Sequence, residues 1–294
     1  MMGKGRLAII AGSGMLPVYV AEAARAAGED PVILPLMHEA DQRWDGFESA
    51  PMSVGDVAGL ARIIKNFRID RVVMSGGVRK RPAFREIHMN LAFLRKLPHA
   101  IRTLLSGGDD AVLKMVIGLI ESQGCQVIGA HEIAPQLLAQ YGPLGAATPT
   151  GDDGRDIERA AEAAAILGSL DVGQGAVSVG GRIVALEGVE GTDRMLARVA
   201  ELREEGRISA RRKGVLVKLC KPQQDIRADL PAIGLSTVEN AARAGLAGVA
   251  VQAGRALLLQ REETLQRADA LGIFICGIEH FQEKCARGFP SGNA

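Results

Sequence analysis

The fold is decided near the amino terminus by the stretch Leu7-Ala8-Ile9-Ile10-Ala11-Gly12-Ser13-Gly14. Its apolar run has the length and the branched side chains expected of a buried strand, and the glycines that follow favour a tight turn. A helix rich in alanine is predicted from Leu16 to Ala27, where Gly28 ends it. Strand, turn and helix in this order make one βα unit.

The same alternation continues through the first half of the chain. Further strands are predicted at residues 31–34, 71–74 and 125–128, and helical periodicity lies between them, for example over residues 94–104. Parallel strands need crossover helices, so this pattern predicts a three-layer, Rossmann-like domain with a parallel sheet.

A length of 294 residues fits two domains. Residues 141–154 are rich in glycine and proline and lack apolar periodicity, which predicts a linker between domains at 1–140 and 155–287. The second domain is expected to be α/β with a mixed sheet, because a hairpin is predicted at 176–186. Residues 249–259 repeat that pattern, which indicates either a second hairpin or a duplicated unit. The tail, 288–294, is expected to be disordered.

Composition excludes several functions. The chain has 35 basic and 34 acidic residues, so it lacks the positive field that nucleic-acid binding requires. The basic runs at 79–81 and 211–213 are typical of surface turns, although a compact anion such as a diphosphate would also suit them. The scattered histidines and cysteines give little support for zinc. No signal peptide or membrane span is predicted, so a cytoplasmic protein is expected.

A polar loop follows an apolar strand predicted at 214–220, and it reads Lys221-Pro222-Gln223-Gln224-Asp225-Ile226-Arg227-Ala228-Asp229-Leu230-Pro231. Ligands of open α/β sheets bind at the carboxyl ends of strands, where this loop begins. Its two prolines restrict the backbone. The candidate binding residues are Lys218, Lys221, Gln224, Asp225 and Arg227. The alternative is an ordinary solvated surface loop.

The turn Gly12-Ser13-Gly14 is a second candidate site, because glycines and a helix amino terminus together suit a phosphate or a nucleotide. Ser75-Gly76-Gly77 ends the third strand at the same edge of the sheet and is expected to complete the pocket. NAD is disfavoured, since Pro17 stands at the third glycine position of the dinucleotide fingerprint and the end of the second predicted strand offers no acid for a ribose until Glu39. A purely steric role for the glycines explains the turn equally well.

Thr192 and Asp193 open a predicted helix directly after the hairpin. The simple interpretation is a helix cap. A helix start with a hydroxyl and carboxylates also suits a phosphate and Mg²⁺ site, in which Asp193 and Asp225 are candidate metal ligands.

Several segments together resemble one family, the UDP-2,3-diacylglucosamine pyrophosphatases of the lipid A pathway that are not calcineurin-like phosphoesterases. The resemblance is carried in order by Ile10 to Pro17, Leu170 to Gln174, Glu187 to Asp193, and Lys221 to Pro231 with its continuation to Thr237. It covers nearly the whole chain, and the Lys221 to Pro231 string is its most specific part. Where the family pattern has Gly-Pro-x-Thr, this chain has Gly234-Leu235-Ser236-Thr237.

The resemblance implies a Mg²⁺-assisted hydrolase that splits UDP-2,3-diacylglucosamine into UMP and 2,3-diacylglucosamine 1-phosphate, also called lipid X. Water would attack the sugar-side phosphorus, and Asp225 would be the essential carboxylate. The resemblance also implies a two-domain homodimer that holds the lipid between its domains and makes transient contact with the inner membrane surface.

Phosphoryl transfer depends mainly on positioning and charge neutralisation. We therefore expect Asp225 to place Mg²⁺ or the attacking water, and the cations Lys218, Lys221 and Arg227 to lie near the diphosphate. The other expected substrate-binding residues are Gly12, Ser13, Gly14, Ser75, Gly76, Gly77, Gln174, Thr192 and Gln224.

Two other functions fit parts of the sequence. A lipid or nucleotide carrier without catalytic activity would bind the same ligands without using Asp225. A nicotinamide-dependent oxidoreductase is suggested only by the strand, glycine and helix order at the amino terminus.

Overall fold

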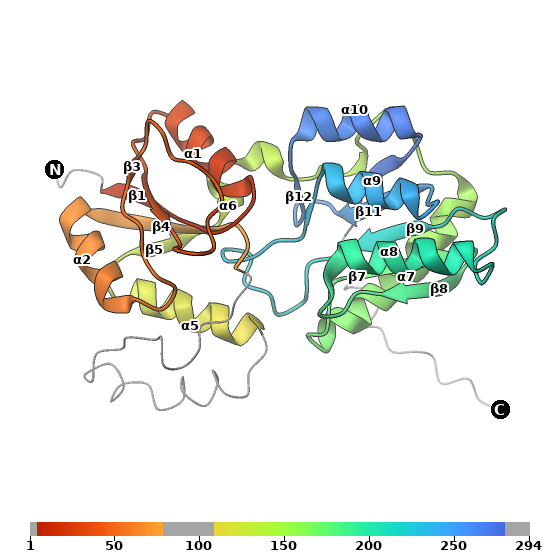
Figure 1. Cartoon of the computed structure of the whole chain (residues 1–294), viewed down its shortest axis with the longest axis horizontal. Helices are drawn as coiled ribbons and strands as arrows, with labels where there is room; N and C mark the ends of the chain where they lie inside the picture. The colour runs from red at the N-terminus through yellow and green to blue at the C-terminus, as the bar shows by residue number, and fades with distance from the viewer. Residues whose placement is uncertain (1–4, 79–108, 280–294) are drawn as a thin grey trace. The chain divides into compact units, whose positions relative to one another are not determined.

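The computed structural model describes residues 5–78 and 109–279 and divides into two units (Figure 1). The N-terminal unit runs to Gln136 and also contains the short segment Asp225–Asp229, whereas the C-terminal unit contains Leu137–Gln224 and the chain from Leu230 onward. The basic run at 79–81, the helix predicted around 94–104 and the tail at 288–294 lie outside the described residues.

The N-terminal unit is built on a five-stranded sheet in the order β3-β2-β1-β4-β5. All four strand pairs are parallel. The strands are β1 (Arg6–Ala11), β2 (Val32–Pro35), β3 (Glu48–Ser49), β4 (Ile69–Ser75) and β5 (Gln126–Ile128). The predicted parallel sheet is confirmed.

Helices cover both faces of this sheet. Leu60 and Ile64 of α2 (Val57–Phe67) and Ile117 and Ile120 of α5 (Asp109–Glu121) pack into one core, while α1 (Leu16–Ala26) and α6 (Ala130–Ile133) contribute to the core on the opposite face. A short 3-10 helix, η2 (Pro135–Leu137), follows α6. Parallel strands between two helical layers make the three-layer architecture that the sequence predicted.

The C-terminal unit has a six-stranded mixed sheet in the order β6-β13-β11-β9-β7-β8. The central strands β9 (Val215–Lys218), β11 (Gly248–Gln252) and β13 (Phe274–Ile278) are parallel. The outer strands are antiparallel, and they are β6 (Gly142–Pro143), β7 (Gly175–Val179) and β8 (Arg182–Leu186). β7 and β8 confirm the predicted hairpin.

The second predicted hairpin, at 249–259, is wrong. β11 lies in the centre of the six-stranded sheet, while β12 (Leu257–Leu258) pairs with β10 (Ala232–Ile233) in a separate two-stranded sheet. The residue pattern resembles that of the first hairpin, but β11 pairs in parallel with β9 on one side and with β13 on the other, so it has no antiparallel hairpin partner.

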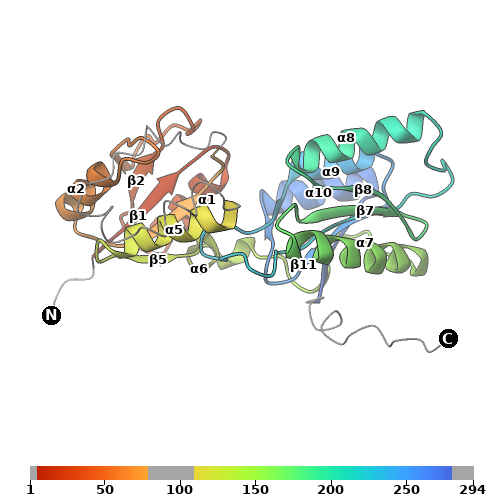
Figure 2. The ribbon, with the colours of Figure 1, turned by 90° about the horizontal axis from the view of Figure 1, so that it is seen from below.

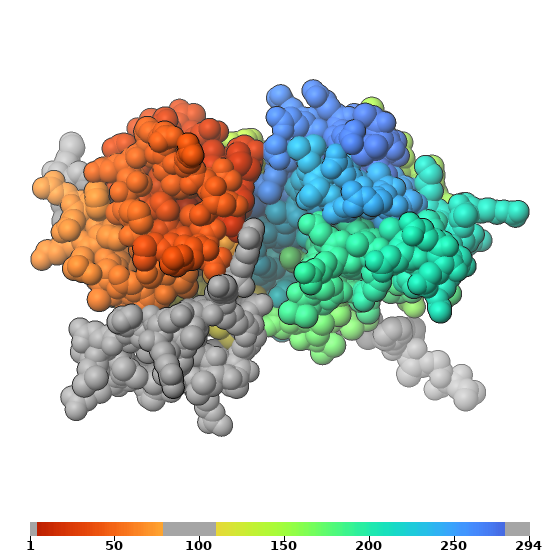
Figure 3. Space-filling view, viewed as in Figure 1, coloured from red at the N-terminus to blue at the C-terminus, as the bar shows by residue number. Residues whose placement is uncertain are grey.

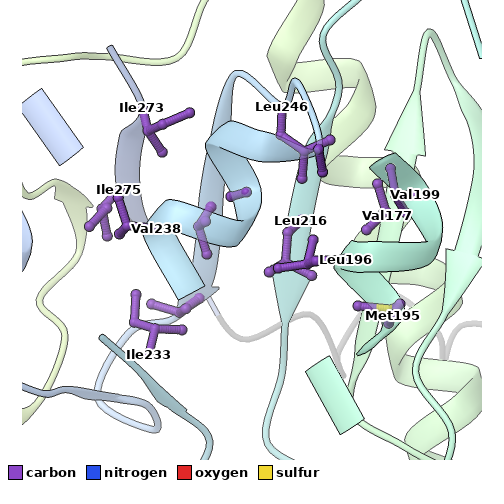
Figure 4. Close-up of a cluster of buried hydrophobic side chains, with 14 of the residues drawn as sticks. Val177, Met195, Leu196, Val199, Leu216, Ile233, Val238, Leu246, Ile273 and Ile275 are labelled. Carbon is purple, nitrogen blue, oxygen red and sulfur yellow. The ribbon is translucent and has the colours of Figure 1, made fainter. Parts of the chain in front are cut away.

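Four helices enclose the C-terminal sheet. Figure 2 shows α7 (Gly151–Ser169) on one face and α8 (Gly191–Glu204), α9 (Leu235–Arg243) and α10 (Arg261–Leu271) on the other. The core beneath these three helices is aliphatic, with Met195, Leu196 and Val238 packed against strand residues such as Leu216 (Figure 4). In the space-filling view the three helices cover this face of the sheet (Figure 3). None of the helices in residues 5–78 and 109–279 has both the length and the hydrophobicity of a membrane-spanning segment.

Candidate active site

Lys218 is the last residue of β9 and points its charge into a polar site at the carboxyl end of that strand. Its side chain is buried, with 6% of the residue exposed. The ammonium donates to Thr192 Oγ1 at 2.8 Å and to the Ala232 carbonyl at 3.4 Å. An ammonium group has three donors, so a third remains for an acceptor on a bound ligand.

The Thr192 hydroxyl links Lys218 to a buried carboxylate. Thr192 Oγ1 donates to Glu187 Oε1 at 2.6 Å, and Glu187 is 6% exposed. Glu187 Oε2 is buried and has no hydrogen-bond partner among the described residues. A buried carboxylate is costly unless it is paired, so the lysine, the threonine and the glutamate stabilise one another.

The helix-cap interpretation of Thr192 and Asp193 is wrong. The cap residue of α8 is Glu190, and it makes no side-chain cap hydrogen bond. Thr192 is instead used by Lys218 and Glu187, while the exposed Asp193 accepts a hydrogen bond from Asn240 Nδ2 at 2.9 Å.

Lys221 makes an ion pair on the same side of the C-terminal unit. Its ammonium lies 2.7 Å from Asp171 Oδ1, and both side chains are largely buried. Asp171 adopts a left-handed backbone conformation with φ of 54°, which aspartate tolerates better than most residues. This conformation directs the chain between α7 and β7.

Side-chain amides shape the first part of the polar loop. Gln224 is buried, and its Oε1 accepts from the Lys221 backbone N–H at 3.0 Å. Gln252 Oε1 accepts from the Cys220 N–H at 3.1 Å. The Gln174 carbonyl accepts from Leu219, whereas its side-chain Oε1 is buried without a partner among the described residues. The loop is therefore held rather than merely solvated, up to Gln224.

Asp225 and Arg227 belong to the N-terminal unit and form a two-pronged ion pair. Asp225 Oδ1 accepts from Arg227 Nε at 2.9 Å and from the Arg227 backbone N–H at 3.1 Å, and Oδ2 accepts from Arg227 Nη2 at 2.7 Å. Arg227 also contacts Glu121 at 2.8 Å. The guanidinium hydrogen bonds lower the pKa of Asp225 against the opposing effect of burial, and they raise the pKa of Arg227.

The two glycine turns of the N-terminal unit lie together, as the sequence predicted. Ser13 and Gly77 exchange backbone hydrogen bonds of 2.8 and 2.9 Å, and the Gly12 N–H donates to the Ser75 carbonyl at 2.8 Å. A Cβ on Gly12 would collide with the Gly77 carbonyl, which is the steric role considered above. The Gly14 N–H donates to Asp41 Oδ1 at 2.9 Å, so a carboxylate already occupies this donor.

The structure thus sorts the predicted site residues into groups. Lys218, Thr192, Lys221, Gln224, Gln174 and Asp193 belong to the C-terminal unit, and the glycine turns, Asp225 and Arg227 belong to the N-terminal unit. In the described parts of both units, no three His, Cys, Asp or Glu residues gather as a metal site would require.

Sequence reasoning assigned no role to two acids of the site, Glu187 and Asp171. Both stand inside strings that carried the family resemblance, and that was the only signal available for them. Their partners lie 5 and 50 residues away in the chain.

Large apolar side chains are exposed next to Asp171 and Glu187 in the sequence. Leu170 and Val172 flank Asp171, and Val189 follows Glu187 by two residues and is fully exposed. The two segments touch, because Gly173 packs on the Glu187 carbonyl. Cations and exposed apolar groups in neighbouring segments suit a ligand with a charged part and an apolar part.

Comparisons with solved structures give distant matches. UDP-glucose 4-epimerase of Thermus thermophilus with NAD aligns with a TM-score of 0.29 and 13% identity, over 98% of this chain and 94% of that chain. The Bordetella bronchiseptica enzyme WbmG with NAD and UDP aligns with a TM-score of 0.27 and 19% identity, over 42% of this chain and 36% of that chain. Scores at this level carry no argument about function.

Sequence comparisons are far closer. The family model of the LpxI N-terminal domain matches residues 6–137, and that of the LpxI C-terminal domain matches residues 140–276. A curated relative, UDP-2,3-diacylglucosamine pyrophosphatase LpxI of Caulobacter vibrioides, is 40% identical over 275 residues, which cover 93% of this chain and 98% of the relative. With both domain models matched and a relative aligned over nearly its full length, the chain belongs to the LpxI family.

Proposed function

We propose that this protein hydrolyses UDP-2,3-diacylglucosamine to UMP and 2,3-diacylglucosamine 1-phosphate, lipid X, in the lipid A pathway. The observation that carries the proposal is the 40% identity to the Caulobacter pyrophosphatase over nearly the whole chain. The arrangement of charges at the carboxyl end of β9 supports it independently, because a diphosphate needs fixed cations.

Lys218 is the cation best suited to hold the diphosphate. Its direct partners are a hydroxyl and a carbonyl, so no carboxylate among the described residues neutralises it by contact, and burial strengthens its attraction for a phosphate oxygen. Lys221 and Arg227 already contact Asp171 and Asp225. In our proposal these two cations add to the positive electrostatic potential at the diphosphate while they remain paired with their carboxylates.

Asp225 orients the attacking water in this proposal. Its lowered pKa keeps it ionised at neutral pH, so it accepts a hydrogen bond from water and is unsuited to protonate a leaving group. The water oxygen bonds to the sugar-side phosphorus, the bond from that phosphorus to the bridging oxygen breaks, and the bridging oxygen leaves with UMP. The oxygen of the water becomes an oxygen of the sugar phosphate, and the protons of the water pass to the product phosphates and to solvent.

Mg²⁺ assistance is part of the proposal, with Asp225 as the protein ligand. Mg²⁺ is commonly held by one or two carboxylates together with substrate phosphates, so a cage of several acids is not needed. Asp225 Oδ2 accepts a single hydrogen bond from the described residues and retains a lone pair. When bound, Mg²⁺ would neutralise charge on the diphosphate. Asp193 fits less well, since it is exposed and bonded to Asn240.

The remaining parts of the proposal concern the nucleotide and the lipid. We assign the uridine nucleotide to the edge at Gly12–Gly14 and Ser75–Gly77, where Ser75 Oγ is buried without a partner among the described residues. We assign acyl chains to the exposed apolar segments at Leu170, Val172 and Val189. Homodimer formation, a cytoplasmic location and contact with the inner membrane surface are further proposals, which the family resemblance suggests.

The test is an assay of UMP release by the purified full chain in water labelled with heavy oxygen. The proposal predicts UMP release and label in the lipid 1-phosphate. Label in UMP would show attack on the other phosphorus and overturn the assignment of the water. Binding of the substrate without any UMP release would identify a carrier instead.

A further inference from the structure

A cavity lies in the C-terminal unit, at the opposite edge of the sheet from Lys218. It has a volume of about 410 Å³ and is lined by Gly214 just before β9, Ala247 just before β11 and Phe274 at the start of β13. Because these strands are parallel, their amino-terminal ends share one edge, whereas Lys218 ends β9 at the other. The volume falls within the usual range for a small-molecule site.

Four cationic side chains line this cavity. Its lining includes Arg155, Arg211, Arg212 and Lys213. Among the described residues none of these four makes an ion pair with a carboxylate, and the one hydrogen bond recorded for their side chains runs from Arg212 Nη1 to the Gly180 carbonyl at 3.4 Å. The four cations of the lining outnumber its three carboxylates, so a bound anion would reduce the repulsion among them.

Two of the three acids in the same lining accept hydrogen bonds from neighbouring groups of the fold. Asp156 is 5% exposed and accepts from Ser178 Oγ and from the backbone N–H groups of Gly180 and Gly181, at 2.6 to 2.9 Å. Asp153 accepts from Thr150 in the capping box of α7. Asp152 is the remaining carboxylate of the lining, so the cations are in excess.

The loop that carries three of the cations is held in place by a single arginine. Arg203 Nη1 donates to the carbonyls of Ser209 at 2.8 Å and Arg212 at 2.9 Å, and Arg203 Nη2 donates to the Lys213 carbonyl at 2.7 Å. Its Nε donates to the Ala244 carbonyl, at the end of α9, at 2.9 Å. A loop fixed in this way loses little entropy when a ligand binds, which favours affinity.

We propose that this cavity binds a phosphate group, either free in solution or on the headgroup of an anionic lipid. Arginine forks and a lysine in a cavity are the usual chemistry for phosphate recognition. The concave shape suits one compact anion. This inference is independent of the proposed hydrolase activity.

The test uses the full chain labelled for amide NMR and titrated with inorganic phosphate. Binding in the cavity predicts saturable shifts of Gly180 and Gly214, both of which line it. The double variant Arg211→Gln with Lys213→Gln should bind about tenfold more weakly, as expected for two partly exposed charge contacts. Arg207→Gln is the matched control, because Arg207 is a nearby exposed cation that pairs with Glu205 and does not line the cavity.

A second arm replaces free phosphate with phosphatidylcholine vesicles that do or do not contain phosphatidic acid. Saturation by inorganic phosphate assigns the cavity to free phosphate groups, and binding to the acidic vesicles alone assigns it to a headgroup. The proposal is overturned if neither probe shifts Gly180 and Gly214, or if the double variant binds like the wild type.

A third variant separates positioning from direct contact. Arg203→Lys keeps the charge but loses the planar fork, so it should weaken phosphate binding several-fold while Arg211 and Lys213 remain. Thermal melting checks that the variant is folded. UMP release by the Arg211 and Lys213 double variant should equal that of the wild type, so a failure of this proposal is distinguishable from a failure of the proposed activity.

Discussion

The loops after β1 and after β9 occupy the same position in their sheets but are built from different interactions. Both begin at the carboxyl end of a central strand that has a parallel neighbour. After β1 the chain closes on the turn after β4 through backbone hydrogen bonds between Gly12, Ser13, Ser75 and Gly77. After β9 the contacts come from side chains, with Lys218, Thr192 and Glu187 in one relay.

The difference shows that topology selects where a ligand can bind, and side-chain chemistry determines which ligand it is. The backbone donors of Gly12, Ser13, Gly14 and Gly77 bind carbonyls and Asp41, so close backbone packing explains most of this turn, and Ser75 Oγ is the buried polar atom left without a partner among the described residues. Among the described residues, the β9 side retains a free ammonium donor and an unpaired carboxylate oxygen, which are groups that a substrate can use.

The largest effect is expected from Asp225→Asn. Asparagine keeps the shape but loses the charge that orients water, so turnover should fall by about 10² to 10⁴ at saturating Mg²⁺. UMP release under saturating substrate measures it. Glu121→Gln is the control, since it removes the other acidic partner of Arg227 and should leave turnover within a few-fold. Wild-type turnover in Asp225→Asn would remove Asp225 from the chemistry.

Gly76→Ala tests the steric account of the glycine turn. Gly76 has φ of +86°, and a Cβ there would lie 2.7 Å from the Ser13 carbonyl oxygen, so the free energy of unfolding should fall by about 2 to 3 kcal/mol. Gly14→Ala is the matched control. Its φ is +89° but no atom lies within 4 Å, so a loss of about 1 kcal/mol is expected. Urea unfolding compares them, and equal losses would contradict the packing argument.

Thr192→Val tests the relay on the other side of the comparison. Valine has a similar shape but leaves Lys218 and Glu187 without their shared hydroxyl, so kcat/KM should fall about tenfold as the ammonium loses its position. Thr192→Ser restores the hydroxyl and should recover most of the activity. Equal activity in the valine and serine variants would show that the relay has no part in catalysis.

The reach of sequence reasoning differs between the same two regions. The hydrophobic periodicity of the sequence predicted the parallel sheet. The positions of the glycines predicted that the two turns meet, because the carboxyl ends of parallel strands share an edge. The relay could not be predicted, since Thr192 and Lys218 are 26 residues apart and meet only through the packing of α8 beside β9. Thr192 looked like a helix cap because the local signal for a cap and for a buried hydroxyl is the same.

The smallest effect is expected for the contribution of the Asp225–Arg227 ion pair to folding stability at acid pH. The folded-state pKa of Asp225 lies below its unfolded value of about 3.9, so its ionised form stabilises the fold above that pH and the contribution is lost as pH falls through the lower folded pKa. The difference in the free energy of unfolding between the wild type and Asp225→Asn should therefore be constant from about pH 7 to 5 and become smaller below about pH 4. We call this difference the stability gap. Urea midpoints over this range measure it.

Substitution of Arg227, the ion-pair partner of Asp225, tests the cause of this pH dependence. Arg227 supplies every hydrogen bond recorded for the Asp225 carboxylate, so in an Arg227→Gln background the gap should be small and nearly independent of pH. A gap that persists unchanged in that background would mean that the pKa of Asp225 is lowered by other groups, such as the nearby charge of Lys114. The source of the field at this carboxylate would then lie on α5 rather than in the loop itself.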